Sequence, residues 1–290
     1  MTWEEIIITI RKDPAYRELV EKAYFEEDLE LNVKRFRDSD EYRETLQLIR
    51  ERIPKTDAVI ADIGAGNGVA SAAFALDGYT VHAIEPDPSA TIGANAIRAL
   101  QQKLQLKNLH VIDSFGEKIP LEDGSCDIVY IRQAMHHAHD LPQFVKEAAR
   151  LLRKGGMLLT VRDHVVYNEK DKQWFLNSHP LHKFYGGENA FTFDEYRGAI
   201  AAAGLNVEKV LRHYDTVINY FPETSADLQQ KLNTREEAIT QGISRKLFSA
   251  AAGVKPLRSW YANRLNAQMG PALDEKKIAG RLITFIAVKP

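Results

Sequence analysis

The sequence predicts an α/β protein in which helices cover both faces of a mostly parallel sheet. Short apolar runs alternate with helical patterns from residue 58 to residue 161, which is typical of a doubly wound sheet. One of these runs ends in three alternate glycines and leads into an Ala-rich helix. In such sheets ligands bind beyond the carboxyl ends of the strands, so each strand-to-helix turn is a candidate site.

The first part of the chain is expected to be helical. Residues 3–52 are rich in Glu, Arg, Leu and Tyr, and apolar residues such as Leu46 and Ile49 recur at helical spacing until Pro54. Beyond Pro54 the apolar runs predict strands at 58–63, 80–84, 109–112, 127–131 and 157–161. The stretches between these runs predict helices at 69–76, 89–104 and 141–152.

The alternation stops after residue 161. We interpret residues 163–191 as a cap loop, because they hold no clear repeat but many His and aromatic residues. A helix at 193–203 and a strand at 207–211 are expected next, and a β-like run at 281–289 closes the chain. The sequence therefore predicts an N-terminal helical segment at 1–53, a core at 54–222 and 278–290, and a helical insertion at 223–277.

The composition excludes several classes of function. A net charge of −2 gives no overall attraction to nucleic acid or to an anionic membrane. Cys126 is the only cysteine, which excludes a disulfide framework and a thiolate metal cage. Acidic residues near the N-terminus stand where a signal peptide carries positive charge, and no apolar run reaches membrane-spanning length. We expect a cytoplasmic protein without a nucleic-acid or membrane partner.

The glycine-rich turn lies in the stretch VIADIGAGNGVASAAFALDG, where Gly64, Gly66 and Gly68 follow a buried strand. Glycines adopt positive φ easily and let a ligand approach the backbone. The helix that follows offers free N–H groups to an anionic group. Glu85 ends the next predicted strand, where its carboxylate suits the two hydroxyls of a ribose.

The spacing of the glycines argues against a dinucleotide and hence against a dehydrogenase. A dinucleotide fingerprint is G-x-G-x-x-G, whereas here Val69 stands in the place of the third glycine. Asp62 also puts a negative charge where a pyrophosphate would bind. A cofactor with a cationic portion and a single carboxylate is favoured, and S-adenosylmethionine has that character.

The chain resembles the class I S-adenosylmethionine-dependent methyltransferases, in their small-molecule, type 11-like group. The matching stretches are DIGAGNG at 62–68, IEPD at 84–87, VIDSFGEKIPLEDGSCDIVYIRQAMHH from residue 111, and ARLLRKGGMLLTV at 149–161. The resemblance implies a Rossmann-like, seven-stranded sheet whose last strand is antiparallel.

The resemblance also implies which residues bind the cofactor. The glycine loop holds the methionine moiety, the acid ending the second strand holds the ribose, and the acid ending the third strand reads the adenine with its neighbours. Two further residues, at the end of the fourth strand, lie along the methionine side. In chain order these candidates are Asp62, Gly64, Ala65, Gly66, Asn67, Gly68, Glu85, Pro86, Asp113, Ser114, Phe115, Arg132 and Gln133.

Three histidines stand in the stretch AMHHAHD at 134–140. Asp140 with Gln143 forms a D-x-x-Q pattern that predicts the start of the following helix, and His139 next to it is expected to be structural or exposed. A metal site is disfavoured, because His136 and His137 are chain neighbours and no carboxylate follows at a ligand spacing.

His136 and His137 follow the fourth strand, at the sheet edge toward which the transferred methyl group would point. Methyl transfer needs alignment, and a base if the acceptor is a hydroxyl. We hypothesise that His137 is this base, supported by His136 and by Asp163 after the fifth strand. Several sugar and natural-product O-methyltransferases look similar here. Further contacts to the substrate are expected from His164, His179, His182, Tyr185 and Glu188, with Gly186 and Gly187 giving the cap mobility.

The sequence thus predicts an S-adenosylmethionine-dependent methyltransferase of a small molecule, acting on a hydroxyl of a metabolite or glycoside. An N- or C-methyltransferase and a non-catalytic scaffold or regulatory protein that binds S-adenosylmethionine are the alternatives. The insertion at 223–277 is expected to be either a second wall of the acceptor cavity or the surface of a homodimer.

Overall fold

The computed structural model describes residues 2–185, 188–246 and 252–290, and it divides the chain into two compact units. The first unit comprises Met1–Asn219 with Ala279–Pro290, and the second comprises Tyr220–Ile278. Gly186 and Gly187, to which the sequence analysis assigned mobility, lie outside the described residues. Within the described part of the chain, none of the helices combines the length and the apolar character that crossing a membrane requires.

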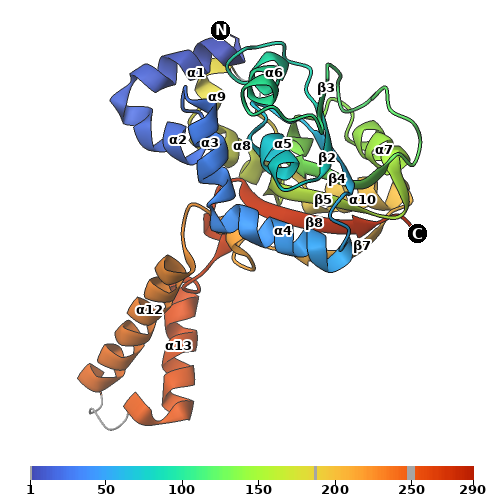
Figure 1. Ribbon diagram of the computed structural model, residues 1–290. Helices are drawn as coiled ribbons and strands as arrows, with labels where there is room; N and C mark the ends of the chain where they lie inside the picture. The colour runs from blue at the N-terminus through green and yellow to red at the C-terminus, as the bar shows by residue number, and fades with distance from the viewer. Residues whose placement is uncertain (1, 186–187, 247–251) are drawn as a thin grey trace. The chain divides into compact units, whose positions relative to one another are not determined.

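An eight-stranded sheet forms the centre of the first unit (Figure 1). Its strand order is β3-β2-β1-β4-β5-β8-β7, with the two-residue β6 paired to β5. Strands β1 to β5 are parallel, and β8 is antiparallel to both of its neighbours, as expected for the last strand. The short β6 is the one strand beyond the expected seven. The bounds are β1 Val59–Ile63, β2 Thr80–Ile84, β3 Leu109–Ile112, β4 Cys126–Arg132, β5 Leu152–Val166, β6 Phe191–Thr192, β7 Asn206–Leu211 and β8 Arg281–Val288.

Helices cover both faces of this sheet, so its central strands are apolar on both sides. On one face Val129 and Ile131 of β4 pack against α7 (Leu141–Leu151) and α10 (Phe193–Ala202) in a single core. On the other face Tyr130 meets Phe74 of α5 (Val69–Leu76) edge to face. A strand buried on both faces reads as a continuous apolar run rather than as an alternating one. Helix α6 (Ala94–Lys103) packs against β3.

The N-terminal helices belong to the first unit, and α3 packs against α5 and α6 (Figure 1). They are α1 (Trp3–Lys12), α2 (Arg17–Lys22), α3 (Leu29–Arg37) and α4 (Asp40–Arg52). Polar side chains cap the beginnings of α1, α3 and α4, where they accept the free N–H groups of the first turn. The amide of Asn67, in the glycine turn, donates to the carbonyl of Tyr24 at 2.7 Å. This bond ties the helical segment to the carboxyl end of β1.

The segment after residue 161 is more regular than its sequence suggested. Strand β5 continues to Val166, and α8 (Glu169–Ser178) and α9 (His182–Tyr185) follow. Helix α8 buries only Phe175 among its residues, so it shows no apolar repeat. Its start is marked instead by Asn168, whose side chain accepts the N–H of Asp171. This cap went unnoticed in the sequence.

The pairing of β5 with β8 contains an irregularity between Thr160 and Asp163. Arg162, inside it, has a φ of 60°, in the left-handed region. An extra residue of this kind re-aims the side chains that follow it. Asp163 is buried immediately after the irregularity.

The second unit is helical. It contains α12 (Ser225–Lys246), α13 (Lys255–Met269) and a short helical turn at Glu275–Lys277. The two long helices share a small apolar core that includes Ile239, Ile243 and Leu265. This unit therefore has apolar contacts of its own.

Candidate active site

The carboxyl ends of β1, β2 and β4 meet at a cavity of about 430 Å³. This is the edge at which doubly wound sheets bind their ligands. Most of the residues expected to bind a cofactor line it, and three side chains from the N-terminal segment join them. The cofactor candidates in the lining are Asp62, Gly64, Ala65, Gly66, Asn67, Glu85, Pro86, Phe115, Arg132 and Gln133; the N-terminal residues are Trp3, Ala23 and Phe25.

The glycine turn has the backbone that its sequence predicted. Gly64, Gly66 and Gly68 have φ values of 73°, 57° and 78°, in the region that favours glycine. A Cβ on Gly64 would stand 2.4 Å from the Cβ of Ala134, so the close approach of two loops requires glycine there. Gly68 precedes the first turn of α5, whereas Gly64 and Gly66 line the cavity.

Two buried carboxyl groups border the cavity. Glu85 accepts the backbone N–H groups of Gly66 and Asp87 at 2.7 and 3.0 Å, and burial raises its pKa to about 7 against these bonds. Asp62 accepts the hydroxyl of Ser71 at 2.5 Å, and burial likewise raises the pKa of Asp62 to about 6. A neighbouring anion would raise both pKa values further, whereas a cationic ligand would favour the ionised carboxylates.

Arg132, at the end of β4, lines the same cavity with its charge already compensated. Its guanidinium binds both carboxylate oxygens of Glu41, in α4, and the side chain of Glu41 is fully buried. Gln133 follows with a φ of 49° and also lines the cavity. Both residues line the cavity, and Arg132 is also part of a buried ion pair. Their contact with the methionine moiety stays a prediction.

The loop after β3 brings one of three expected residues to the cavity. Phe115 lines it with a side chain that is 58% exposed. Asp113 is exposed and pairs with Arg98 at 2.7 Å, and the hydroxyl of Ser114 donates to the carbonyl of Lys118. Among the described residues, Asp113, Ser114 and Gly68 are not part of the cavity lining. Their expected contact with the cofactor stays a prediction.

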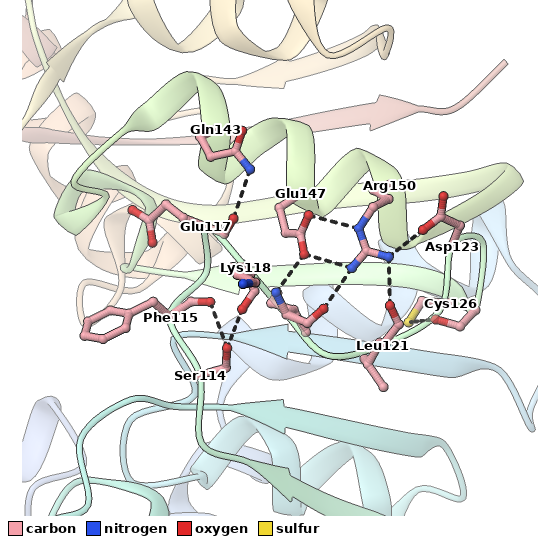
Figure 2. Close-up of polar contacts among 12 residues, drawn as sticks. Ser114, Phe115, Glu117, Lys118, Leu121, Asp123, Cys126, Gln143, Glu147 and Arg150 are labelled. Carbon is pink, nitrogen blue, oxygen red and sulfur yellow. Dashed lines mark hydrogen bonds and ion pairs between the residues drawn. The ribbon is translucent and has the colours of Figure 1, made fainter.

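Polar contacts to α7 hold this loop in place (Figure 2). Glu147 accepts the backbone N–H of Ile119 at 2.7 Å. Arg150 donates to the carbonyls of Ile119 and Leu121 and pairs with the carboxylate of Asp123. The amide of Gln143 donates to the carbonyl of Glu117. The wall of the cavity that carries Phe115 is thereby fixed to a helix of the core.

The turn after β4 holds the predicted helix cap and histidines. Asp140 accepts the N–H of Gln143 at 3.0 Å and starts α7, as predicted. His139 lines the cavity with its ring 5.8 Å from that of Phe115, and its backbone N–H donates to Glu117. Its position is thus set by local geometry.

His136 is buried and held by Asp163. One carboxylate oxygen of Asp163 lies 2.9 Å from Nδ1 of His136 and accepts the backbone N–H of His136 at 3.0 Å. Burial opposes the charge of His136, but the hydrogen bonds with Asp163 and Glu188 outweigh it and raise the pKa to about 9. The sequence hypothesis had Asp163 and His136 both supporting His137; Asp163 lies within β5 and bonds His136.

Glu188 faces both histidines, which the sequence did not indicate. Its Oε2 lies 3.7 Å from Nε2 of His136 and 4.0 Å from Nε2 of His137. Burial raises the pKa of this carboxyl, but His136 and its neighbouring histidines hold it well below its usual range. His137 differs from His136 in exposure, since its side chain is 42% exposed and lines the cavity.

The remaining substrate candidates gather behind the two histidines. Nδ1 of His164 donates to the carbonyl of Gly280, and burial holds the pKa of His164 well below the usual range. Nδ1 of His179 lies 3.7 Å from Oε1 of Glu188. His182 is half-buried, and its Nδ1 has no hydrogen-bond partner within the described part of the chain. The side chain of Tyr185 lies outside the described residues.

Residues 61–160 match the family described as "Methyltransferase domain". This match contains the glycine turn, Glu85 and the paired histidines. Residues 61–160 therefore carry a methyltransferase domain.

Curated relatives of this methyltransferase domain carry different names. The uncharacterized methyltransferase YcgJ of Bacillus subtilis (strain 168) is 30% identical over 149 residues, which are 50% of this chain and 57% of that protein. The dimethylglycine N-methyltransferase of Parasynechococcus marenigrum (strain WH8102) is 30% identical over 124 residues, 41% of each chain. The chain thus spans about half the length of the curated relatives it matches.

A solved structure supports the fold of the domain. The geranyl diphosphate C-methyltransferase of Streptomyces coelicolor A3(2), in complex with Mg²⁺, geranyl diphosphate and S-adenosyl-L-homocysteine, superposes with a TM-score of 0.55 at 13% identity. The superposition covers 99% of this chain and 97% of that one. At this identity the likeness shows the fold alone.

Sequence reasoning missed the N-terminal lining and the partner of Arg132. Trp3, Phe25 and Glu41 lie outside the motifs of the methyltransferase domain and far from them along the chain. The sequence offered one indication of this ion pair, because Glu41 is an acidic residue on the apolar face of α4.

Proposed function

We propose that the protein is a methyltransferase that moves a methyl group from S-adenosylmethionine to a hydroxyl of a small metabolite or glycoside. The observation that carries this proposal is the position of His137. It lies in the wall of the cofactor cavity, next to the buried set of His136, Asp163 and Glu188. The cytoplasmic location, the absence of a nucleic-acid partner and the choice between lid and dimer surface for the insertion stay predictions.

The lining of the cavity suits the chemical groups of S-adenosylmethionine. The buried carboxylate of Glu85 suits the ribose hydroxyls, and Phe115 offers an aromatic face to the adenine. Gly64 and Gly66 leave their backbone accessible to the methionine moiety, and the acid Asp62 suits its cationic groups. The cofactor supplies the activated methyl group on its sulfonium.

We expect the acceptor to bind against His137. In the proposed reaction the acceptor oxygen attacks the methyl carbon in line as the carbon–sulfur bond breaks, and S-adenosylhomocysteine leaves. The proton of the hydroxyl passes to Nε2 of His137, and the carboxylate of Glu188 stabilises the imidazolium that forms. His136 is the less suitable base because it is buried and already bonded to Asp163.

The choice of oxygen as the acceptor atom depends on His137 rather than on the fold. The named relatives include an N-methyltransferase, and a structural neighbour is a C-methyltransferase. Neither amine nor carbon acceptors are excluded by the cofactor cavity, so the argument for oxygen depends on a base at the methyl position. A cofactor-binding scaffold without acceptor chemistry is the remaining alternative.

Two measurements test the proposal. Calorimetry should show binding of S-adenosylmethionine and none of NAD. Purified protein incubated with methyl-labelled S-adenosylmethionine and a panel of hydroxylated metabolites, glycosides and amines should then label a hydroxylated member. Label on amines alone would overturn the hydroxyl acceptor, and tight cofactor binding with no labelled product from any member would favour the scaffold.

A further inference from the structure

Three metal-ligand side chains converge beside the cofactor cavity. His136, His137 and Glu188 each offer one ligand atom, and these three atoms all lie within 4.8 Å of one another. The two histidine Nε2 atoms stand 3.7 and 4.0 Å from the same carboxylate oxygen. Zinc-like ions bind such atoms at about 2.0–2.2 Å, which puts neighbouring ligands about 3.3 Å apart. Closing the site would shorten the two distances to Glu188 by about 0.4 and 0.7 Å and the distance between the two histidine nitrogens by up to about 1.5 Å.

The surroundings of His136 are those of a metal ligand. A ligating histidine typically donates its second ring N–H to a carboxylate, which fixes the tautomer and orients the ring. Nδ1 of His136 lies 2.9 Å from Asp163, so Nε2 is the nitrogen directed at Glu188. The second oxygen of Asp163, Oδ2, is buried and has no hydrogen-bond partner among the described residues. The hydrogen-bonding capacity of the Asp163 carboxylate is therefore not fully used by the described residues.

The charge of the cluster also suits a cation. Asp163 and Glu188 are two carboxylates whose side chains are 0% and 5% exposed. Burying carboxylates is costly unless cations or hydrogen bonds compensate them. A divalent ion would compensate both carboxylates at once.

We propose that His136, His137 and Glu188 form a binding site for a divalent transition-metal ion of the zinc type. Two histidines and one glutamate are a known ligand set for zinc sites that keep a coordination position open. Because His137 lines the cavity, the open position faces the acceptor side. The bound ion takes the place of the proton that His136 shares with Glu188.

The ion also has a consequence for catalysis, and this part rests on the proposed function. Metal and acceptor proton compete for the same lone pair on Nε2 of His137. The metal-bound protein therefore lacks its base, and zinc should inhibit methyl transfer. Metal binding itself does not depend on the reaction.

The binding test uses purified full-length protein that has been stripped with a chelator. Titration calorimetry with Zn²⁺ should give one equivalent per chain, and Co²⁺ should give the d–d absorption of a low-symmetry site. Asp163→Asn should weaken zinc binding about 10- to 100-fold. Glu188→Gln and His137→Ala, which each remove a ligand, should weaken it at least as much.

His110→Ala is the matched control, because His110 is an exposed histidine paired with His82 on the sheet edge away from the cluster. It should leave the zinc affinity unchanged. Equal affinity in the wild type, Glu188→Gln and His137→Ala would overturn the proposal and indicate adventitious surface binding. Thermal unfolding of each variant shows whether a loss of binding reflects a loss of fold.

The activity arm separates the two proposals. Added Zn²⁺ should abolish labelled methyl transfer by the wild type, and a chelator should restore it. Labelled transfer without zinc binding would refute the metal site and leave the function standing. Zinc binding that depends on these residues, without labelled transfer to any acceptor, would refute the proposed function and leave the metal site standing.

Discussion

Arg132 and Glu41 form a two-point ion pair between the end of β4 and helix α4. Nε and Nη2 of Arg132 lie 2.6 and 3.1 Å from the two oxygens of Glu41. Arg162 approaches the same carboxylate at 3.4 Å, and Glu41 itself is fully buried. Because Arg132 lines the cavity at the carboxyl ends of the strands, this pair connects the N-terminal helices to the candidate site.

Removing the charge of Glu41 should be strongly destabilising. Glu41→Gln leaves the guanidinium groups of Arg132 and Arg162 buried without their counter-charge. Breaking a buried ion pair from one side costs about 3–5 kcal/mol of unfolding free energy. Urea denaturation followed by circular dichroism measures this loss.

The exposed pair of Arg98 and Asp113 is the matched control, with side chains that are 37% and 60% exposed. Asp113→Asn should cost about 0–1 kcal/mol, as is usual for surface pairs. A loss for Glu41→Gln no larger than that for Asp113→Asn would show that the buried pair does not stabilise the fold.

Cofactor affinity should fall as the pH falls through 7. The pKa of Glu85 is raised to about 7, mainly by burial, from an ordinary value of 4.5. Ribose hydroxyls donate to the ionised form, so protonation removes the acceptor. Below pH 7 the affinity for S-adenosylmethionine should drop by up to about tenfold per pH unit, because binding the ionised form of Glu85 then releases one proton. Calorimetry at pH 8, 7, 6 and 5 measures this slope.

The same shift has the opposite sign for the stability of the free protein. Between pH 4.5 and 7 the folded carboxyl of Glu85 binds more protons than the unfolded one. Its contribution to stability therefore rises as the pH falls through this window. Glu85→Gln should bind the cofactor more weakly and remove this part of the pH dependence. An unchanged pH slope in Glu85→Gln would exclude Glu85 as the titrating group.

Replacing His137 should affect turnover and spare the cofactor. A general base contributes roughly 100- to 10,000-fold to the rate, so His137→Ala should lower kcat by that factor on a hydroxyl acceptor. The affinity for S-adenosylmethionine should stay within about twofold, because the ring contributes no expected contact to the ribose or adenine. His110→Ala serves as the control. Full turnover by His137→Ala would show that His137 is not the general base.

Local patterns predicted most of the sheet and the cofactor loop. Strands β2 and β3 and helix α5 have the expected bounds, because apolar runs and the glycine turn are signals contained in a few consecutive residues. Gly64, Gly66, Glu85 and Arg132 reach one cavity because the carboxyl ends of parallel strands share an edge.

Contacts between segments that are distant along the chain could not be predicted from local patterns. The extension of β5 and the helix α8 have no apolar repeat to reveal them. Glu188 reaches His136 from a segment that follows β5 and α8, and Glu41 reaches Arg132 from the N-terminal helices. No spacing rule links such residues, because the three-dimensional path of the chain decides their meeting.

A crystal structure with S-adenosylhomocysteine tests the central claim most directly. The account predicts both ribose hydroxyls at hydrogen-bond distance from the carboxylate of Glu85, about 2.5–3.0 Å, and the sulfur directed at His137. A nucleoside bound elsewhere, or a sulfur directed away from His137, would contradict the account.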